Sequence, residues 1–256
     1  MFYKAPRGTQ DILPREQPHW RYVLDRASHL AEQFGYHKID TPVFEQSGLF
    51  VRTVGEGTDI VEKETYTFHD RGNEEITLRP EGTAPICRSY LEQGMHSLPQ
   101  PVRLFYFSPI FRYERPQSGR FRQHHQFGIE AIGDSDPVID AEVIQLGWEF
   151  TKLLGLENLD LVINSIGDSE CRPSYLESLR EYYYQPVSEG LVCSDCELRY
   201  ERNVLRMLDC KREDFSCQIL GDRAPASHNH LCVNCKVHWD TVTKHLNSMG
   251  IPFRTS

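Results

Sequence analysis

Hydrophobic residues recur with two different periods along the first 155 residues of the chain. Between residues 15 and 34 they fall three and four positions apart, which is the spacing of an amphipathic helix. Residues 83–94 and 137–154 are also predicted to be helical, and Pro137 stands at a first helical position, where proline is tolerated. Strands are predicted where apolar and polar residues alternate or β-forming residues gather, and these stretches are residues 35–45, 65–80, 102–115 and 122–133.

The order of these elements indicates an α+β protein. Residues 65–80 contain two alternating runs around Gly72, which predicts a hairpin, and a polar loop joins 102–115 to 122–133. Strands and helices do not alternate regularly, so a parallel doubly wound sheet is not expected. A further strand at 159–167 and a helix at 174–184 follow. We therefore expect a mixed or antiparallel sheet flanked by helices.

Composition narrows the class of protein. The chain has 256 residues, 39% of them hydrophobic and 25% charged, which is ordinary for a globular protein. No apolar run approaches the roughly 18 residues of a membrane span, and the first residues lack the apolar core of a secretory signal, so we expect a cytoplasmic protein without a membrane partner. A net charge of -9 argues against sequence-blind coating of nucleic acid.

One basic segment stands out in this acidic chain, "FRYERPQSGRFRQHHQFGIE", residues 111–130. Because strand side chains alternate between faces, one face of the predicted hairpin would present Arg112, Glu114, Gln126 and Glu130 together. Arginine suits bidentate phosphate contacts, and carboxylates suit an ammonium group. The face could therefore bind a zwitterionic or phosphorylated ligand. The alternative is a solvent-facing hairpin decorated with salt bridges.

The same segment resembles the second signature motif of class II aminoacyl-tRNA synthetases, in the form found in histidyl-tRNA synthetases. "APRGTQDILP" resembles that family's N-terminal segment, and "GYHKIDTPVFE" its first motif. "GTDIVEKETYTFHDR", "TLRPEGTAP", "NSIG" and "RNVLRMLDCK" follow in the family's order, so the resemblance covers residues 5–250. It implies the class II synthetase sheet flanked by helices, with a small cysteine-rich insertion.

The resemblance also implies a site, residue by residue. The residues expected to bind histidine are Glu81, Thr83, Gln126 and Glu130. The residues expected to bind ATP are Arg112, Glu114, Arg120 and His124. His124 stands where the family usually stacks a phenylalanine on adenine. Arg112 is the expected catalytic residue, because it would hold the α-phosphate and neutralise charge that develops there.

The implied function is that of a histidine–tRNA ligase. Histidine and ATP, with Mg²⁺ on the phosphates, would give histidyl-adenylate, and tRNA(His) would then accept the histidine. The first motif, around Pro42, implies a homodimer.

Six of the eight cysteines fall between residues 193 and 235. Two C-x-x-C pairs, "CSDC" and "CVNC", suggest a tetrahedral zinc site formed by Cys193, Cys196, Cys232 and Cys235. The competing ligands are Cys210, Cys217, His228 and His230. The alternative is a set of reduced, half-buried thiols without metal.

The resemblance implies a domain plan. Residues 1–170 would be the N-terminal part of the catalytic domain, and residues 171–250 the cysteine-rich insertion. No segment matches the third motif or the anticodon-binding domain, so the chain is expected to be truncated and to charge little or no tRNA alone. Two other functions remain open: the regulatory subunit of ATP phosphoribosyltransferase, which shares the fold, and a non-enzymatic zinc-knuckle module that binds nucleic acid or protein.

Overall fold

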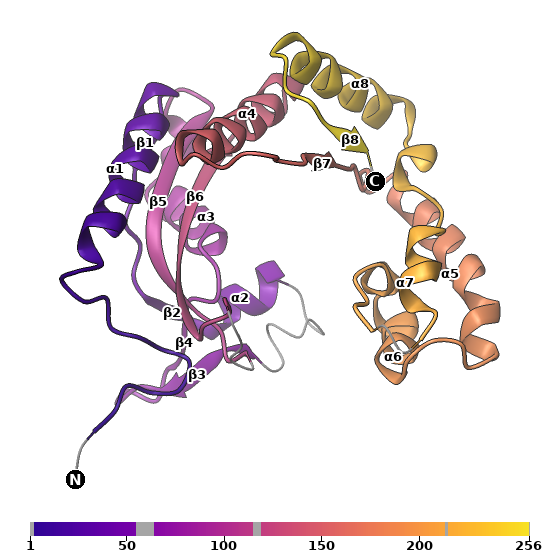
Figure 1. Ribbon diagram of the computed structural model, residues 1–256, viewed down its shortest axis with the longest axis horizontal. Helices are drawn as coiled ribbons and strands as arrows, with labels where there is room; N and C mark the ends of the chain where they lie inside the picture. Colours follow the sequence, from indigo (N-terminus) through magenta and orange to yellow (C-terminus); the bar gives the residue numbers. More distant parts are fainter. Residues whose placement is uncertain (1–2, 55–63, 115–118, 213–214, 256) are drawn as a thin grey trace. The chain divides into compact units, whose positions relative to one another are not determined.

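The computed structural model describes residues 3–54, 64–114, 119–212 and 215–255 (Figure 1). The chain forms two compact units. The first comprises Met1–Ser135 with Glu142–Glu157, and the second Asp136–Ala141 with Asn158–Ser256. The predicted division into 1–170 and 171–250 concerns the family's domain plan and stays a prediction.

The first unit is built around the long hairpin of β5 (Val102–Phe111) and β6 (Gln123–Ile132), two neighbouring arrows in Figure 1. The strands pair antiparallel along their whole length, and β1 (His37–Lys38) adds to β5 in parallel. A second sheet has the antiparallel order β2-β4-β3. Its strands are β2 (Phe44–Gln46), β3 (Tyr66–His69) and β4 (Glu75–Leu78). Both predicted hairpins are present, and the prediction of an α+β fold is confirmed.

The predicted strand at residues 35–45 is divided between the two sheets. β1 ends at Lys38 and β2 begins at Phe44, with Pro42 between them. Proline has no N–H to donate to a neighbouring strand. The carbonyl oxygens of Thr41 and Pro42 instead accept hydrogen bonds from the Arg79 guanidinium, at 2.9 and 3.2 Å.

Helices cover both faces of the β5–β6 hairpin. The helices of this unit are α1 (Gln17–Gln33), α2 (Ser47–Val54), α3 (Thr83–Glu92), the 3-10 turn η2 (Met95–Ser97) and α4 (Pro137–Leu153), whose first residues belong to the second unit. On one face, Ala31 of α1 and Leu146 of α4 pack with Phe105 of β5. On the other face, Ile86 of α3 packs with Tyr106. The apolar periodicity that predicted α1, α3 and α4 is therefore the pattern of residues that face the sheet. The sequence did not predict α2 or η2.

The second unit is mainly helical. Its helical elements are α5 (Arg172–Ser188), α6 (Ser194–Arg202), η3 (Val204–Met207), α7 (Cys217–Asp222), η4 (Ser227–His230) and α8 (Val233–Ser248). The strand predicted at 159–167 is reduced to β7 (Val162–Ile163), which pairs in parallel with β8 (Arg254–Thr255). Leu179, Tyr183, Val204 and Met207 pack with four cysteines in its core. Among the described helices of both units, none is both long and apolar enough to cross a membrane.

Candidate functional site

The register of the β5–β6 hairpin sets which side chains share a face. Ile110 lies opposite His124, Ser108 opposite Gln126, and Leu104 opposite Glu130. Directly opposed residues of antiparallel strands project to the same side, so His124, Gln126 and Glu130 share one face of the sheet. Arg112 lies two residues beyond Ile110, and its backbone N–H still donates to Arg122 O at 2.9 Å. The strand geometry therefore extends to Arg112, on the side predicted from the alternation.

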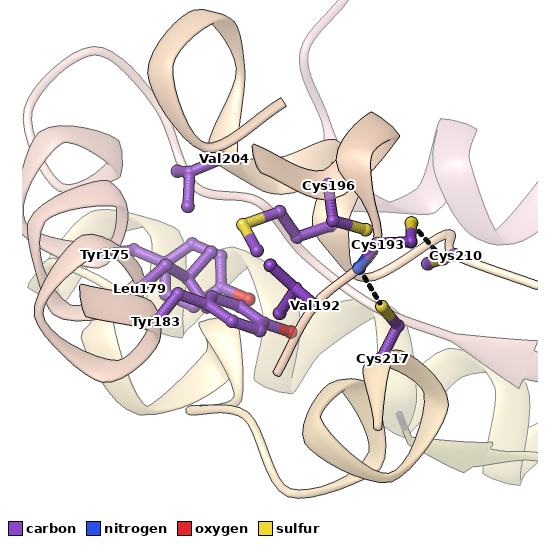
Figure 2. Close-up of a cluster of buried hydrophobic side chains, with 10 residues drawn as sticks. Tyr175, Leu179, Tyr183, Val192, Cys193, Cys196, Val204, Cys210 and Cys217 are labelled. Atoms are coloured by element: carbon purple, nitrogen blue, oxygen red, sulfur yellow. Dashed lines mark hydrogen bonds between the residues drawn. The ribbon is translucent and has the colours of Figure 1, made fainter. Parts of the chain in front are cut away.

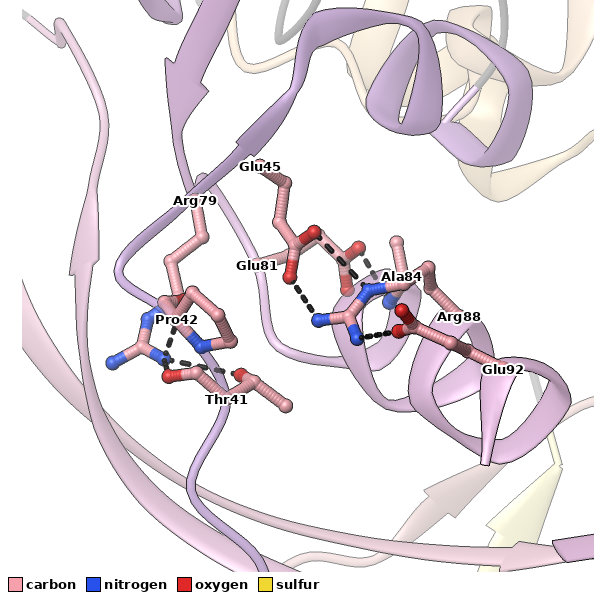
Figure 3. A network of polar contacts seen from close by, with 8 residues as sticks. All are labelled: Thr41, Pro42, Glu45, Arg79, Glu81, Ala84, Arg88 and Glu92. Carbon is pink, nitrogen blue, oxygen red and sulfur yellow. Dashed lines mark hydrogen bonds and ion pairs between the residues drawn. The ribbon is translucent and has the colours of Figure 1, made fainter. Parts of the chain in front are cut away.

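Glu81 and Thr83 reach this face from the start of α3. The Glu81 carboxylate accepts the backbone N–H group of Thr83 at 2.6 Å and that of Ala84 at 2.8 Å, and so caps the helix. Figure 3 shows the second of these hydrogen bonds. The Thr83 hydroxyl donates to Glu130 Oε1 at 2.7 Å. The start of α3 and the far end of β6 thus bring together the carboxylates of Glu81 and Glu130, which are 49 positions apart in the sequence.

The environment of Glu130 raises the pKa of its carboxyl group. Burial is the main cause, and the negative charge of Glu81 adds to it, while the bond from Thr83 opposes both. Burial and the same two carboxylates also raise the pKa of Tyr106. A cation placed between Glu81 and Glu130 would relieve their repulsion, so the arrangement favours binding of an ammonium or a protonated ring.

Tyr106 lies between two glycines at the centre of this face. A Cβ on Gly82 or on Gly128 would overlap the end of the Tyr106 ring. The ring is 3% exposed. Both glycines are therefore required for close packing, because no larger side chain leaves room for the tyrosine.

The loop that carries Glu81 is held by Arg79, a residue that sequence reasoning missed. Arg79 is 3% exposed and spans the space between three backbone segments. Its Nε donates to Pro109 O at 2.8 Å, and its Nη1 to Thr41 and Pro42 (Figure 3). Burial lowers the pKa of this guanidinium. The only local signal was a lone arginine at the end of an apolar strand, which does not by itself indicate burial.

A second ion pair fixes α3 against the neighbouring sheet. The Arg88 guanidinium contacts the Glu45 carboxylate of β2, and its Nη1 contacts Glu92 Oε2 at 2.7 Å (Figure 3). The Arg88 side chain is 28% exposed and that of Glu45 is 10% exposed. Partly buried charge-assisted pairs of this kind are stronger than exposed pairs. The position of Thr83 at the start of α3 is therefore braced from two sides, by Arg79 and by Arg88.

The predicted ATP residues lie at the other end of the face. Arg112 Nε donates to Pro80 O at 2.8 Å, which ties the arginine to the Glu81 loop. Arg120 Nη1 pairs with Glu114 Oε2 at 3.3 Å. Burial, followed by the nearby Arg112 charge, lowers the pKa of His124, so its ring is neutral at pH 7. Residues 115–118 of the motif lie outside the described residues.

The sequence did not establish the role of Arg122, and the structure shows that this side chain packs against Tyr113. Its guanidinium stacks over the Tyr113 ring at 3.8 Å, and its Nε donates to Glu114 O at 3.2 Å. Its backbone N–H donates to Gly8 O at 2.7 Å. The N-terminal segment is thereby fastened to the hairpin beside the predicted ATP residues.

Comparison with known proteins shows the family of this chain. The sequence model of the histidyl-tRNA synthetase family matches residues 8–167, more than half of the chain. The chain belongs to the histidyl-tRNA synthetase family. The resemblance predicted from the motifs is confirmed.

Related sequences of the histidyl-tRNA synthetase family match nearly the whole chain. A histidine–tRNA ligase of Dehalococcoides mccartyi is 56% identical over 98% of this chain, and one of Desulforamulus reducens is 50% identical over 99%. The match covers 59% of each relative. The chain therefore spans about three fifths of the length of these curated relatives.

Solved structures give the same result. Apo histidyl-tRNA synthetase of Staphylococcus aureus matches all of this chain and 57% of its own, with a TM-score of 0.75 and 37% identity. A protein of Bacillus halodurans described as an ATP phosphoribosyltransferase regulatory subunit/histidyl-tRNA synthetase matches 97% of this chain and 66% of its own, with a TM-score of 0.64 and 20% identity. That second likeness shows the fold alone and does not favour the regulatory alternative.

The cysteines of this histidyl-tRNA synthetase family member do not gather as the sequence suggested. Cys193 and Cys196 lie with Cys210 and Cys217, whereas Cys232 and Cys235 lie with Asp168 and Cys171. Pairing of the two C-x-x-C motifs in one site was therefore wrong. The segment between them forms η3, α7 and η4, and it brings its own two thiols to the first motif. The spacing of cysteines in the sequence does not reveal which of them lie together in the fold.

Proposed function

We propose that this chain carries the histidine- and ATP-binding face of a histidine–tRNA ligase. The observation that supports the proposal most strongly is the shared face of the β5–β6 hairpin, with Arg112 at one end and the Thr83–Glu130 hydrogen bond of 2.7 Å at the other. The activity of the whole protein is part of the proposal, because the chain spans 59% of its curated relatives.

The carboxylate end of the face fits histidine. Glu81 and Glu130 supply negative charge for the α-ammonium group and for an imidazole N–H, and the Thr83 hydroxyl lies beside them. Gln126 is on the same face, between this end and Arg112, and its amide can donate to or accept from the substrate. In the proposed complex, binding of the cationic ammonium lowers the cost of ionising Glu130.

The arginine end fits ATP. Arg112 would contact the α-phosphate, Arg120 the outer phosphates and Glu114 the adenine amino group. Binding would then require Arg120 to exchange its pairing with Glu114 for phosphate contacts. The neutral His124 ring would stack on adenine without adding charge. Mg²⁺ would arrive with ATP and bridge its phosphates.

The proposed reaction has two steps and no protein nucleophile. In the first, a histidine carboxylate oxygen attacks the α-phosphorus, the bond to the bridging oxygen breaks, and pyrophosphate leaves. In the second, a terminal ribose hydroxyl of tRNA(His) attacks the carbonyl carbon of the adenylate and AMP leaves. The protein holds the reacting atoms in line, and Arg112 compensates the negative charge that builds on the α-phosphate.

Several further parts of the proposal rest on family membership. We propose a homodimer, a cytoplasmic location and a cysteine-rich insertion at residues 171–250 that contains structural zinc. The supporting observations are the match to the family over residues 8–167 and the clusters of metal-ligating side chains in the second unit.

Replacement of Arg112 tests the proposed role. In the protein made from the complete reading frame that encodes this chain, Arg112→Ala should lower histidine-dependent ATP–pyrophosphate exchange by at least about 100-fold, because a preorganised positive charge is lost where the transition state needs it. Arg21→Ala, on the exposed side of α1, is the matched control and should leave exchange unchanged. Circular dichroism checks that both variants fold. Exchange by Arg112→Ala at the control's rate would overturn the assignment.

A further inference from the structure

The second unit contains two groups of metal-ligating side chains that share no residue. The first consists of Cys193, Cys196, Cys210 and Cys217, and all four are buried. The second consists of Asp168, Cys171, Cys232 and Cys235. In each group the four candidate ligand atoms lie within 4.8 Å of one another. All eight cysteines of the chain are free thiols.

We propose that the second unit binds two zinc ions, one in each of these four-residue groups. This deepens the structural zinc proposed above, because it specifies two ions and their ligands and places one ligand, Asp168, before residue 171. Neither group includes a residue of the histidine- or ATP-binding face.

The distances in the first group fit a tetrahedral ion. Cys193 Sγ and Cys210 Sγ are 3.8 Å apart (Figure 2). Four sulfurs at the usual Zn–S distance of about 2.3 Å stand about 3.8 Å apart along each edge of the tetrahedron. This pair of sulfurs therefore already has the separation that a shared zinc ion would impose, and all four sulfurs lie within 4.8 Å of one another.

The backbone around the first group is arranged as for a thiolate site. Cys193 is the N-cap residue of α6, so Cys193 and Cys196 lie at the start of a helix, where its dipole favours negative charge. The Cys193 N–H donates to Cys217 Sγ at 3.3 Å (Figure 2). Backbone donors to sulfur stabilise the deprotonated ligand that zinc requires.

The second group repeats the same local structure. Cys232 is the N-cap of α8, and its Sγ accepts the backbone N–H of Cys235 at 3.5 Å. Asp168 completes the group. Its Oδ1 accepts the N–H groups of Glu170 and Cys171, at 2.9 and 3.1 Å, which leaves Oδ2 directed toward Cys232 Sγ, 3.9 Å away. One oxygen is thus held by the backbone while the other is placed to bind an ion, as in sites where outer contacts orient a carboxylate ligand.

Packing of neutral thiols explains these groups less well. Cysteine can act as a small apolar residue, and in a core it would pack its sulfur mainly against carbon. In the first group, sulfurs from three separate segments meet one another instead, at the edge of a core whose large members are Tyr175, Leu179 and Tyr183 (Figure 2). A bound metal ion would stabilise a unit with so small a core, as structural metals commonly do in small domains.

Metal content of variants tests the proposal in the full chain. The wild-type protein, expressed with ample zinc, should contain about two zinc ions per chain by mass spectrometry of the elements. Cys210→Ser should lose one ion from the first group, and Cys171→Ser one from the second. Cys87→Ser, which lies in α3, should keep both.

These variants separate the proposal from a single site made of the two C-x-x-C motifs. A single site predicts about one zinc ion, which neither Cys210→Ser nor Cys171→Ser would remove. That result, or a wild-type protein with less than about half an equivalent of zinc, overturns the proposal.

Cobalt substitution keeps the test decisive if a serine variant does not fold. The metal-free wild-type chain titrated with Co²⁺ should show thiolate-to-cobalt absorption that saturates at about two equivalents. Asp168→Cys should preserve the second equivalent, because a thiolate replaces the carboxylate, whereas Asp168→Ala should weaken its binding. Saturation at about one equivalent contradicts the proposal.

Discussion

Glu130 is half-buried and lies on the face proposed to bind histidine. Its carboxyl accepts from Thr83 at 2.7 Å and lies near a second carboxylate, Glu81. In the absence of a cation this is an unfavourable place for a negative charge, and the pKa of Glu130 is raised accordingly. A site that costs stability until its ligand arrives is typical of functional residues.

The raised pKa of Glu130 predicts that the free energy of unfolding depends on pH. Below the ordinary glutamate pKa of 4.5, Glu130 is protonated in the folded and unfolded chain alike. As the pH rises toward its raised pKa, the unfolded chain ionises first, so the protein loses stability through that window. Glu130→Gln should remove this loss. Urea unfolding from pH 4 to pH 7 should then show the variant gaining stability relative to wild type as the pH rises.

The exposed Glu75→Gln variant of β4 is the matched control, because it makes the same change of charge at the surface. The interpretation fails if the stability difference between Glu130→Gln and wild type does not change with pH, or follows that of Glu75→Gln.

At the scale of single residues, the alternation of the hairpin predicted the shared face of Arg112, Gln126 and Glu130, since pleating fixes which side chains project together. The alternation of the hairpin could not reveal the burial of Arg79 or of Tyr106. Their positions depend on three backbone segments and two glycines that the fold brings together from distant parts of the sequence.

At the scale of elements, the contact between β6 and the start of α3 depends on Tyr106. The ring occupies the space beside Gly82 and Gly128, so the helix that presents Thr83 can approach the strand that presents Glu130. Arg88 of α3 and Glu45 of β2 reinforce this arrangement from the other side of the helix.

Two glycine substitutions should therefore act in opposite directions. Gly128→Ala should destabilise the protein by about 1–3 kcal/mol, because the new methyl group meets the buried ring. Gly147→Ala, at an exposed position in α4 with nothing within 4 Å of the new methyl, should stabilise it by about 0.5–1 kcal/mol. Denaturant unfolding of both variants measures the difference. Equal effects of the two substitutions would rule out the close packing of Tyr106.

The elements themselves were predictable where the pattern was long and regular. The two hairpins and the helices α1, α3 and α4 follow the apolar periodicity, whereas α2 was not predicted. The strand predicted at residues 35–45 is divided around Pro42 into β1 and β2, which join different sheets, and Arg79 binds the backbone between them. The partners of each C-x-x-C motif were not predictable. Both motifs begin a helix, and only the path of the chain through η3 and α7 decides which thiols join which motif.

At the scale of the whole molecule, the two compact units carry different chemistry. The first contains the proposed histidine- and ATP-binding face, and the second contains both proposed zinc sites. Family membership applies to the chain as a whole, while the chain spans 59% of its curated relatives. The ligase activity must therefore be measured on the protein made from the complete reading frame.

Amino-acid selectivity of ATP–pyrophosphate exchange tests the central claim most directly. The protein is assayed with each of the standard amino acids in turn, at equal concentration. We predict exchange with histidine that exceeds that with every other amino acid by about 10⁴-fold, because Glu130 would pair with the imidazole N–H of histidine and would lose that partner with any other side chain. Absence of exchange with histidine, or equal exchange with another amino acid, would contradict the account.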